Sequence, residues 1–152
     1  MEKTTKMEFV SISKLKPYEN NARTHSEEQI QKIVNSLTEF GFVNPVIIDE
    51  NNMILVGHGR TEAAKRLGID KVPCVRVSYL SEKEKRAYIL ADNLLSDMAG
   101  WDREMMLAEL SRISDIDMTL FGFEDINIPE DQQPKAEKEK VVCPKCGYEW
   151  EG

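Results

Sequence analysis

The segment 53–68 constrains the fold of this chain more than any other stretch. Four apolar residues, 53–56, predict a strand, and the apolar spacing at 63–67 then predicts a short helix that Gly68 ends. Two glycines, a histidine and an arginine lie between the two elements, at 57–60. A helix N-terminus presents unpaired backbone N–H groups and a partial positive charge, which suit a phosphate or another anion. We therefore expect the chemistry of the chain at this strand-to-helix corner.

The remaining patterns predict a small mixed α/β domain around this corner. Ser26, with Gln29 three residues later, forms a capping-box pattern and predicts a helix that Gly41 ends. Ser81 begins a second capping box and a helix through about residue 95, and Asp102 is expected to cap a third. Short apolar runs predict strands and their turns within 8–16, 45–49, 53–56 and 72–77. Alternating charges at 82–86 predict that Lys83, Lys85 and Arg86 lie on a solvated helix face rather than in a DNA-binding patch.

Composition limits the partners and the compartment. The 152 residues are 41% hydrophobic and 31% charged, which is typical of a soluble globular protein. The net charge of −7 disfavours tight DNA binding by this chain alone, because DNA affinity depends on positive charge. A polar N-terminal segment without an apolar stretch, and the lack of any membrane-spanning run, predict a cytoplasmic protein with no membrane partner.

The C-terminal end predicts a linker and a metal-binding tail. Residues 127–140 are charged and flanked by prolines, as linkers are. Beyond them, Cys143 and Cys146 precede a glycine at the spacing of a zinc knuckle. Such a knuckle supplies two ligands of the four that zinc needs, so a second chain, Cys74 with a histidine, or residues beyond this sequence would complete it. A tail without function and a redox pair are the alternatives.

Three segments carry a resemblance to a known family. Residues 15–23 are similar to a Pro-rich first box that ends in arginine, and 57–60 with the alanines that follow are similar to a Gly-x-x-Arg phosphate loop. Residues 91–94 are similar to a degenerate third box. Along 8–126 the chain thus resembles the N-terminal domain of the ParB/sulfiredoxin superfamily. Further segments, 81–93, 100–102 and 121–123, resemble a phage and mobile-element branch associated with DNA methyltransferases.

This resemblance implies a fold and a division of the chain. The fold is a small sheet with flanking helices, followed by a C-terminal helical segment and the zinc-knuckle-like tail. The expected ParB-like domain covers 1–126, with a core at about 8–97 and a helical extension at 98–126. The linker at 127–140 and the tail at 141–152 follow. Domains of this kind commonly close on each other around a nucleotide, so a homodimer is expected.

The resemblance also implies a site for a nucleoside triphosphate, CTP or ATP, with Mg²⁺. The expected nucleotide-binding residues are Gly57, His58, Gly59, Arg60 and Thr61, with Arg23 as a lid. Asp92 and Asn93 are the expected Mg²⁺ ligands. The candidate catalytic residues are Glu62 and Asp92. The alternatives are a turn that merely joins strand to helix at 57–60, a solvated loop histidine or arginine, and an ordinary polar helix face at 92–93.

Departures from the family narrow the activity. His58 stands where sulfiredoxins have their catalytic cysteine, which argues against sulfinic-acid reduction. The sequence behind the domain holds no helix-turn-helix pattern, which argues against site-specific centromere binding. Asp92 replaces a glutamate, and Leu95-Ser96 replace a Gln-Arg pair, so hydrolysis is expected to be slow or missing.

Three classes of function follow from these sequence features. The first is a nucleotide-binding module or weak NTPase in phage or plasmid DNA metabolism, acting with DNA or a DNA-modifying partner such as a methyltransferase. The second is an enzyme of the same fold, either a metal-dependent nuclease or a small-molecule kinase. The third is a non-catalytic adaptor with a decayed nucleotide site.

Overall fold

The computed structural model describes residue 3 and residues 5–123, 140–142 and 149–151. The chain divides into two compact units. The first comprises Met1–Gly100 with Leu120–Gly122, and the second comprises Trp101–Thr119 with Phe123–Gly152. The candidate site lies entirely in the first unit.

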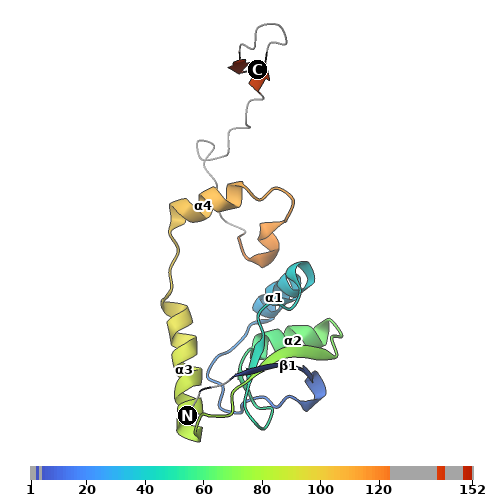
Figure 1. Cartoon of the computed structure of the whole chain (residues 1–152), viewed down its shortest axis with the longest axis vertical. Coiled ribbons are helices and arrows are strands. Elements are labelled where there is room, and N and C mark those ends of the chain that lie inside the picture. The colour runs from blue at the N-terminus through green and yellow to red at the C-terminus, as the bar shows by residue number, and fades with distance from the viewer. Residues whose placement is uncertain (1–2, 4, 124–139, 143–148, 152) are drawn as a thin grey trace. The chain divides into compact units, whose positions relative to one another are not determined.

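A four-stranded sheet forms the centre of the first unit (Figure 1). Its strands are β1 (Lys6–Ser11), β2 (Val46–Ile48), β3 (Ile54–Val56) and β4 (Lys71–Arg76), in the order β1-β4-β2-β3. Strand β2 runs parallel to β4, whereas the β1–β4 and β2–β3 pairs are antiparallel. The mixed α/β class predicted from the sequence is confirmed.

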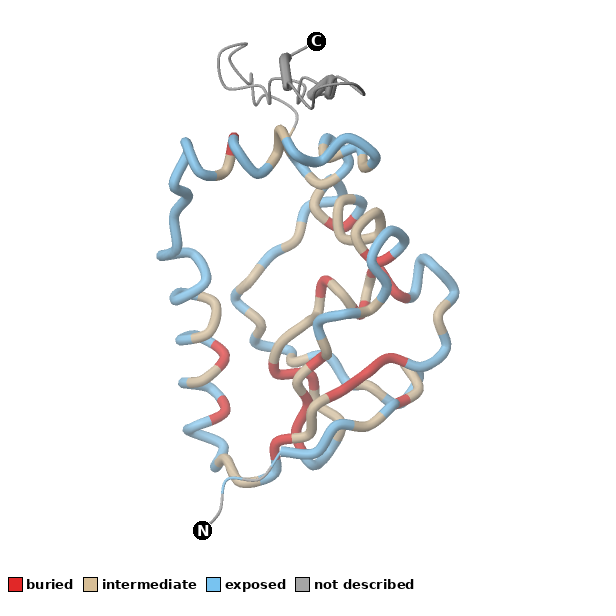
Figure 2. Tube along the Cα trace, turned by 45° about the horizontal axis from the view of Figure 1, so that its top comes forward, coloured by how far each residue is buried: buried red, intermediate tan, exposed pale blue. Residues whose placement is uncertain are grey.

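Helices α1 (Glu27–Phe40) and α2 (His58–Arg66) pack against each other, and both contribute residues to a core shared with the sheet. Their inner faces and the strands form one buried core (Figure 2). This core consists of Val10, Ile30, Leu37, Val46, Ile48, Ile54, Ala63, Ala64, Val72 and Cys74. A short 3₁₀ helix, Ile12–Lys14, follows β1. The predicted helix ends are confirmed at Gly41 and Gly68, which both have positive φ angles.

Helix α3 (Glu82–Met98) begins with the predicted capping box, in which Ser81 and Glu84 satisfy each other's backbone N–H groups. The prediction of a solvated face is wrong for Lys85, whose exposed fraction is 1%. Its ammonium group lies 2.9 Å from carboxylate oxygens of Asp49, Glu50 and Glu82. This ion cluster fastens the first turns of α3 to the β2–β3 turn.

Asp49 is the buried member of that cluster, with an exposed fraction of 2%. Its carboxylate also accepts hydrogen bonds of 2.8 Å from the backbone N–H groups of Asn51 and Met53. Burial alone would raise the pKa of Asp49, but the bonds from Lys85 and the two N–H groups outweigh it and lower that pKa. Burial alone would lower the pKa of Lys85, and its three carboxylate partners raise it instead. Both groups are therefore charged.

The second unit contains helix α4 (Arg103–Ser111), a 3₁₀ helix that begins at Met118, and the antiparallel strands β5 (Lys140–Val142) and β6 (Glu149–Glu151). Asp102 caps α4 as predicted, because its side chain accepts from the N–H of Met105. Cys143, Cys146 and most of the predicted linker lie outside the described residues. None of the described helices is long and apolar enough to cross a membrane.

Candidate functional site

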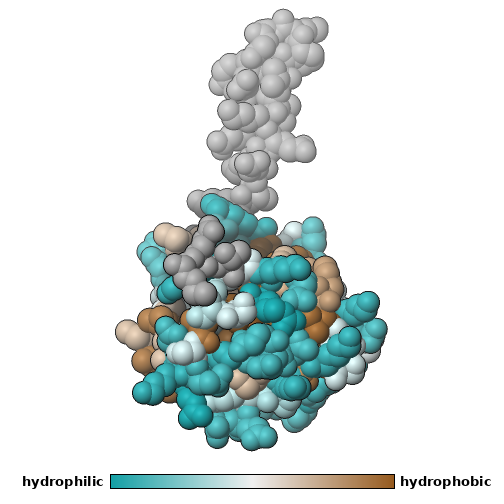
Figure 3. All heavy atoms as spheres, turned by 60° about the horizontal axis from the view of Figure 1, so that its bottom comes forward, coloured by the Kyte–Doolittle hydropathy of each residue, from teal (hydrophilic) through white to brown (hydrophobic). Residues whose placement is uncertain are grey.

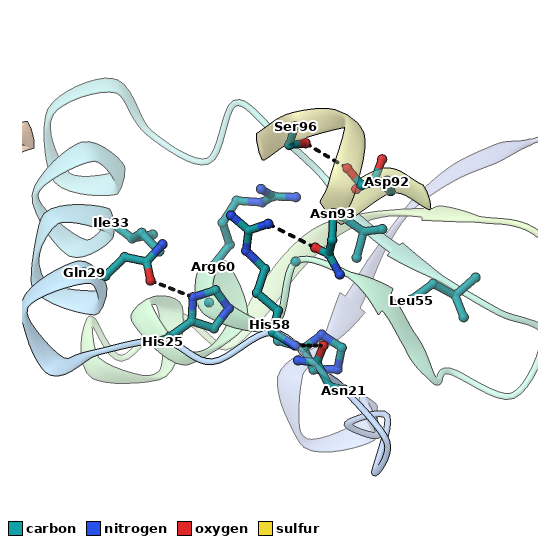
Figure 4. A pocket seen from close by; sticks show the side chains of 14 residues that line it. Asn21, His25, Gln29, Ile33, Leu55, His58, Arg60, Asp92, Asn93 and Ser96 are labelled. Atoms are coloured by element: carbon teal, nitrogen blue, oxygen red, sulfur yellow. Dashed lines mark hydrogen bonds between the residues drawn. The ribbon is translucent and has the colours of Figure 1, made fainter. Parts of the chain in front are cut away.

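Helices α1, α2 and α3 surround a cavity of about 220 Å³ at the predicted strand-to-helix corner (Figure 4). Gln29 and Ile33 reach it from α1, and Asp92, Asn93 and Ser96 from α3. The end of β3 and the start of α2 supply residues 55–60. The loop before α1 supplies Asn21, Arg23 and His25. Most of the predicted nucleotide-binding residues therefore meet in one place.

The two glycines of the corner are required by its geometry. Gly57 has a φ angle of +107°, which side-chain-bearing residues rarely adopt, and a Cβ there would lie 3.2 Å from Nη2 of Arg60. A Cβ on Gly59 would lie 3.0 Å from Cδ1 of Ile33 and 3.1 Å from Cε1 of His25. The absence of both side chains keeps the backbone at the N-terminus of α2 close to the cavity, where its N–H groups can face an anion.

Arg60 brings a partly buried positive charge to this corner. Its Nη2 donates to the carbonyl oxygen of Pro45 at 3.1 Å. Its Nε is buried and has no hydrogen-bond partner among the residues that the structure describes. Burial lowers the pKa of the guanidinium and the carboxylate of Asp92 opposes that shift, but arginine remains protonated. A charged group with one buried N–H that lacks a partner suits an anionic ligand.

His58 joins the corner to the loop that holds the first box. Its Nε2 accepts a hydrogen bond of 3.1 Å from the backbone N–H of Tyr18. Burial, and then the nearby His25, lower the pKa of His58, so the ring is neutral at neutral pH. Because Nε2 is the acceptor, the proton is assigned to Nδ1. His58 therefore orients the loop, and its Nδ1–H is the group left for a ligand.

Arg23 lies at the cavity but is engaged with α3. Its Nη1 donates to Oδ1 of Asn93 at 3.3 Å, and its Nη2 lies 3.3 Å from Oδ1 of Asp97. Figure 4 shows the hydrogen bond that Asn93 accepts. Asp97 was not among the predicted site residues, because nothing in its sequence context distinguishes it from other exposed helix carboxylates.

Two predicted site residues lie away from this cavity. Thr61 is buried, and its hydroxyl donates to the carbonyl oxygen of Gly57 at 3.0 Å. It therefore stabilises the turn at 57–60 and does not face the cavity. Glu62 lies on the rim of a neighbouring cavity, 3.7 Å from Nε of Arg66 and 3.9 Å from Nζ of Lys65. The structure does not bring either side chain together with Arg60 and Asp92.

The sequence did not predict the roles of His25 and Gln29. The side chain of Ser26 caps α1 through the N–H of Gln29, as expected. The side chain of Gln29 does not complete the capping box and instead lies 3.1 Å from Nδ1 of His25. The S-x-x-Q pattern predicts a capping glutamine and gives no sign of its contact with His25. That contact depends on the packing of His25 against Gly59, which the sequence does not show.

No group of three or more His, Cys, Asp or Glu side chains suited to a metal occurs within the described part of the chain. Cys74 is fully buried in β4, and burial raises the pKa of its thiol to about 11, which disfavours the thiolate that zinc requires. It therefore does not suit the role of an additional zinc ligand. A zinc half-site at Cys143 and Cys146 stays a prediction.

The fold and the site define a domain class, and comparison with known families identifies it. The ParB N-terminal domain family matches residues 1–94. The chain therefore belongs to this family, which confirms the resemblance of the sequence to ParB-type domains.

Similar proteins support the assignment of the chain to the ParB N-terminal domain family. The ParB-like nuclease domain-containing protein YnaK of Escherichia coli is 43% identical over 86 residues, which are 57% of this chain and 99% of that protein. A probable chromosome-partitioning protein ParB of Rickettsia prowazekii is 30% identical over 89 residues, which are 58% of this chain and 31% of that protein. The chain thus spans less than a third of the length of that ParB protein.

Solved structures confirm the fold. C-terminally truncated ParB from Caulobacter crescentus, complexed with CTP-γ-S, has a TM-score of 0.61 at 21% identity, covering 70% of this chain and 61% of that one. A Pnob8-like ParB-N domain has a TM-score of 0.52 at 24% identity, covering 98% of this chain and 58% of that one.

Proposed function

We propose that this chain binds a nucleoside triphosphate in the cavity between α1, α2 and α3. The observation that carries the proposal is the partly buried guanidinium of Arg60, whose buried Nε lacks a partner among the described residues, beside the glycine-lined N-terminus of α2. Phosphate oxygens would satisfy both the guanidinium and the helix N–H groups. Membership of the ParB N-terminal domain family and the CTP-γ-S complex of a structural relative support it.

The side chains around the cavity divide the work of holding a triphosphate. The backbone of residues 57–60 and the Arg60 guanidinium would hold the phosphates, and the Nδ1–H of His58 offers one more donor. Asp92 and Asn93 present a carboxylate and an amide oxygen from the opposite wall. Mg²⁺ typically uses one or two such protein oxygens together with phosphate oxygens, so these residues fit that ion. Bound Mg²⁺ would neutralise phosphate charge.

We infer that hydrolysis is slow or missing. Glu62 lies outside the cavity, which leaves Asp92 as the one predicted catalytic candidate that lines it. Binding without rapid turnover suits a nucleotide-dependent module rather than an efficient enzyme.

We further propose that the module acts in DNA metabolism of phages or plasmids, as a homodimer and together with DNA or a DNA-modifying partner. The names of its relatives, a ParB-like nuclease domain protein and chromosome-partitioning proteins, support the part of this proposal that concerns DNA metabolism. Hydrophilic side chains cover most of the face drawn in Figure 3. With a net charge of −7, the chain is expected to need its partner or its nucleotide to approach DNA.

Isothermal titration calorimetry tests the proposal. CTP, ATP, GTP and ADP are titrated with and without Mg²⁺ into the wild-type chain, Arg60→Lys and Arg86→Ala. Arg60→Lys keeps the charge but loses the planar fork of donors, so we expect affinity to fall about 10- to 100-fold, the worth of a charged hydrogen bond. Arg86 is exposed and lies outside the cavity, so its variant should bind like the wild type.

Three results would speak against the proposal. If the folded wild-type protein binds none of the nucleotides, the hypothesis of a non-catalytic adaptor with a decayed nucleotide site would be favoured. Equal binding by the wild type and Arg60→Lys would place the nucleotide elsewhere. Metal-dependent nicking of plasmid DNA that persists in Arg60→Lys would indicate a nuclease with a separate site.

A further inference from the structure

Arg23 occupies the oxygen that the proposed metal ion would need. The amide group of Asn93 has one atom that can bind a cation, its Oδ1, and this atom accepts the hydrogen bond from Arg23. This oxygen has two lone pairs, but a guanidinium and Mg²⁺ that both approach it repel each other, because both are positively charged. Binding of a Mg²⁺-triphosphate through Asn93 would therefore favour the departure of Arg23 from this oxygen.

Asp97 is what opposes this departure. It lies one helical turn beyond Asn93 on α3 and pairs with the other terminal nitrogen of Arg23. Arg23 lines the triphosphate cavity and also an adjoining one, which Asn93 and Asp97 line as well. The guanidinium thus lies between two sets of possible acceptors. One set is the side-chain oxygens of α3, and the other is the oxygens of phosphates bound in the cavity.

We propose that Asp97 is a positioning residue that competes with the triphosphate for Arg23. In the ligand-free protein Asp97 and Asn93 hold Arg23 on α3. When a triphosphate binds, the guanidinium transfers to a phosphate oxygen, and Oδ1 of Asn93 would then be available to hold Mg²⁺. This inference rests on the proposed function, and it adds a residue that sets the affinity of the same site.

Solvent exposure makes the exchange feasible. The side chain of Asp97 is 65% exposed, so its carboxylate regains water when it loses Arg23. Exposed ion pairs are individually weak, whereas an arginine bound to phosphate makes charge-assisted and often bidentate hydrogen bonds. The transfer therefore replaces a weak pair with a stronger one, and Asp97 subtracts only the modest strength of that weak pair from the affinity.

Titration of Asp97→Ala with the triphosphate that binds the wild type, in the presence of Mg²⁺, measures this competition. Loss of an exposed pair should tighten binding by about two- to fivefold. Asp97→Glu keeps a carboxylate and should bind like the wild type. Glu39→Ala removes an exposed carboxylate from α1 and controls for the change in net charge.

A double-variant cycle shows whether the gain passes through Arg23. In an Arg23→Ala background, Asp97→Ala should leave the affinity unchanged, because no guanidinium remains to compete for. Unchanged or weaker binding by Asp97→Ala, an equal gain in Glu39→Ala, or a gain that persists without Arg23 would each overturn the inference while leaving the nucleotide site in place. Failure of the wild-type chain to bind any triphosphate would instead refute the proposed function and, with it, the exchange.

Discussion

The ion cluster at the start of α3 makes Lys85→Met a sharp test of how this helix is attached. The substitution keeps an unbranched apolar stem of similar length and removes the ammonium group. Glu50 and Glu82 have side chains that are 44% and 74% exposed, so both regain water when Lys85 is lost. Asp49 cannot do so, because its side chain is only 2% exposed. The loss in the free energy of unfolding is therefore set by one buried carboxylate, that of Asp49, which is left without its cationic partner.

The magnitude follows from what Asp49 keeps. Removing one partner of a buried ion pair costs about 3–5 kcal/mol. Asp49 retains hydrogen bonds from two backbone N–H groups, which places the loss near the lower end, at about 3 kcal/mol. For a chain of this size that corresponds to a fall in Tm of roughly 6–12 °C. Lys83→Met, an exposed position on the same helix, should stay within about 0.5 kcal/mol of the wild type.

Urea unfolding followed by far-ultraviolet circular dichroism measures these free energies of unfolding. Adding Asp49→Asn to Lys85→Met should recover at least half of the loss, because the asparagine side chain keeps an oxygen for the two N–H groups and carries no charge. A cost below about 1 kcal/mol for Lys85→Met would refute the reasoning, since a stranded buried charge cannot be that cheap. So would a double variant that is no more stable than the single one.

Two further predictions concern the corner itself. Gly57→Ala should lower the free energy of unfolding by about 1–2 kcal/mol, which is the cost of a left-handed conformation for alanine. The new methyl group should also displace Arg60 and so weaken triphosphate binding. Urea unfolding measures the first effect and calorimetry the second, and unchanged values would contradict the geometry of this corner. Because the pKa of His58 is lowered below 6.5 in the folded state, the unfolded chain binds more protons below that pH, and stability should fall as the pH drops from 6.5. His58→Gln, whose amide oxygen can still accept from Tyr18, should flatten this slope in urea titrations across that range, and an unaltered slope would assign it to other groups.

Local signals in the sequence predicted much of the fold. The caps at Ser81 and Asp102 and the glycine stop at Gly41 depend on residues within one helical turn, so a short window contains the whole cause. The strand, glycine corner and helix at 53–68 were predictable for the same reason, because their spacing and conformational needs are local. The family boxes then indicated which loops approach the corner.

The contacts that sequence reasoning missed join residues far apart in the chain. Lys85 lies among alternating charges that look solvated, and only the turn at Asp49 and Glu50, more than thirty residues earlier, makes it buried. Asp97 likewise gains its role from Arg23, across the chain. Side-chain pairs of this kind depend on tertiary packing, which a periodic pattern of charge or hydropathy does not encode.

The reactivity of Cys74 depends on whether the sheet around β4 is closed or open. Its thiol is fully buried in β4, between β1 and β2, and its pKa of about 11 keeps it protonated. The thiolate is the reactive form of cysteine, so the folded chain protects this sulfur twice, by exclusion of reagents and by suppression of its ionisation. Modification of Cys74 by a thiol reagent is therefore expected to require opening of the sheet around β4, and its rate would report how often that opening occurs.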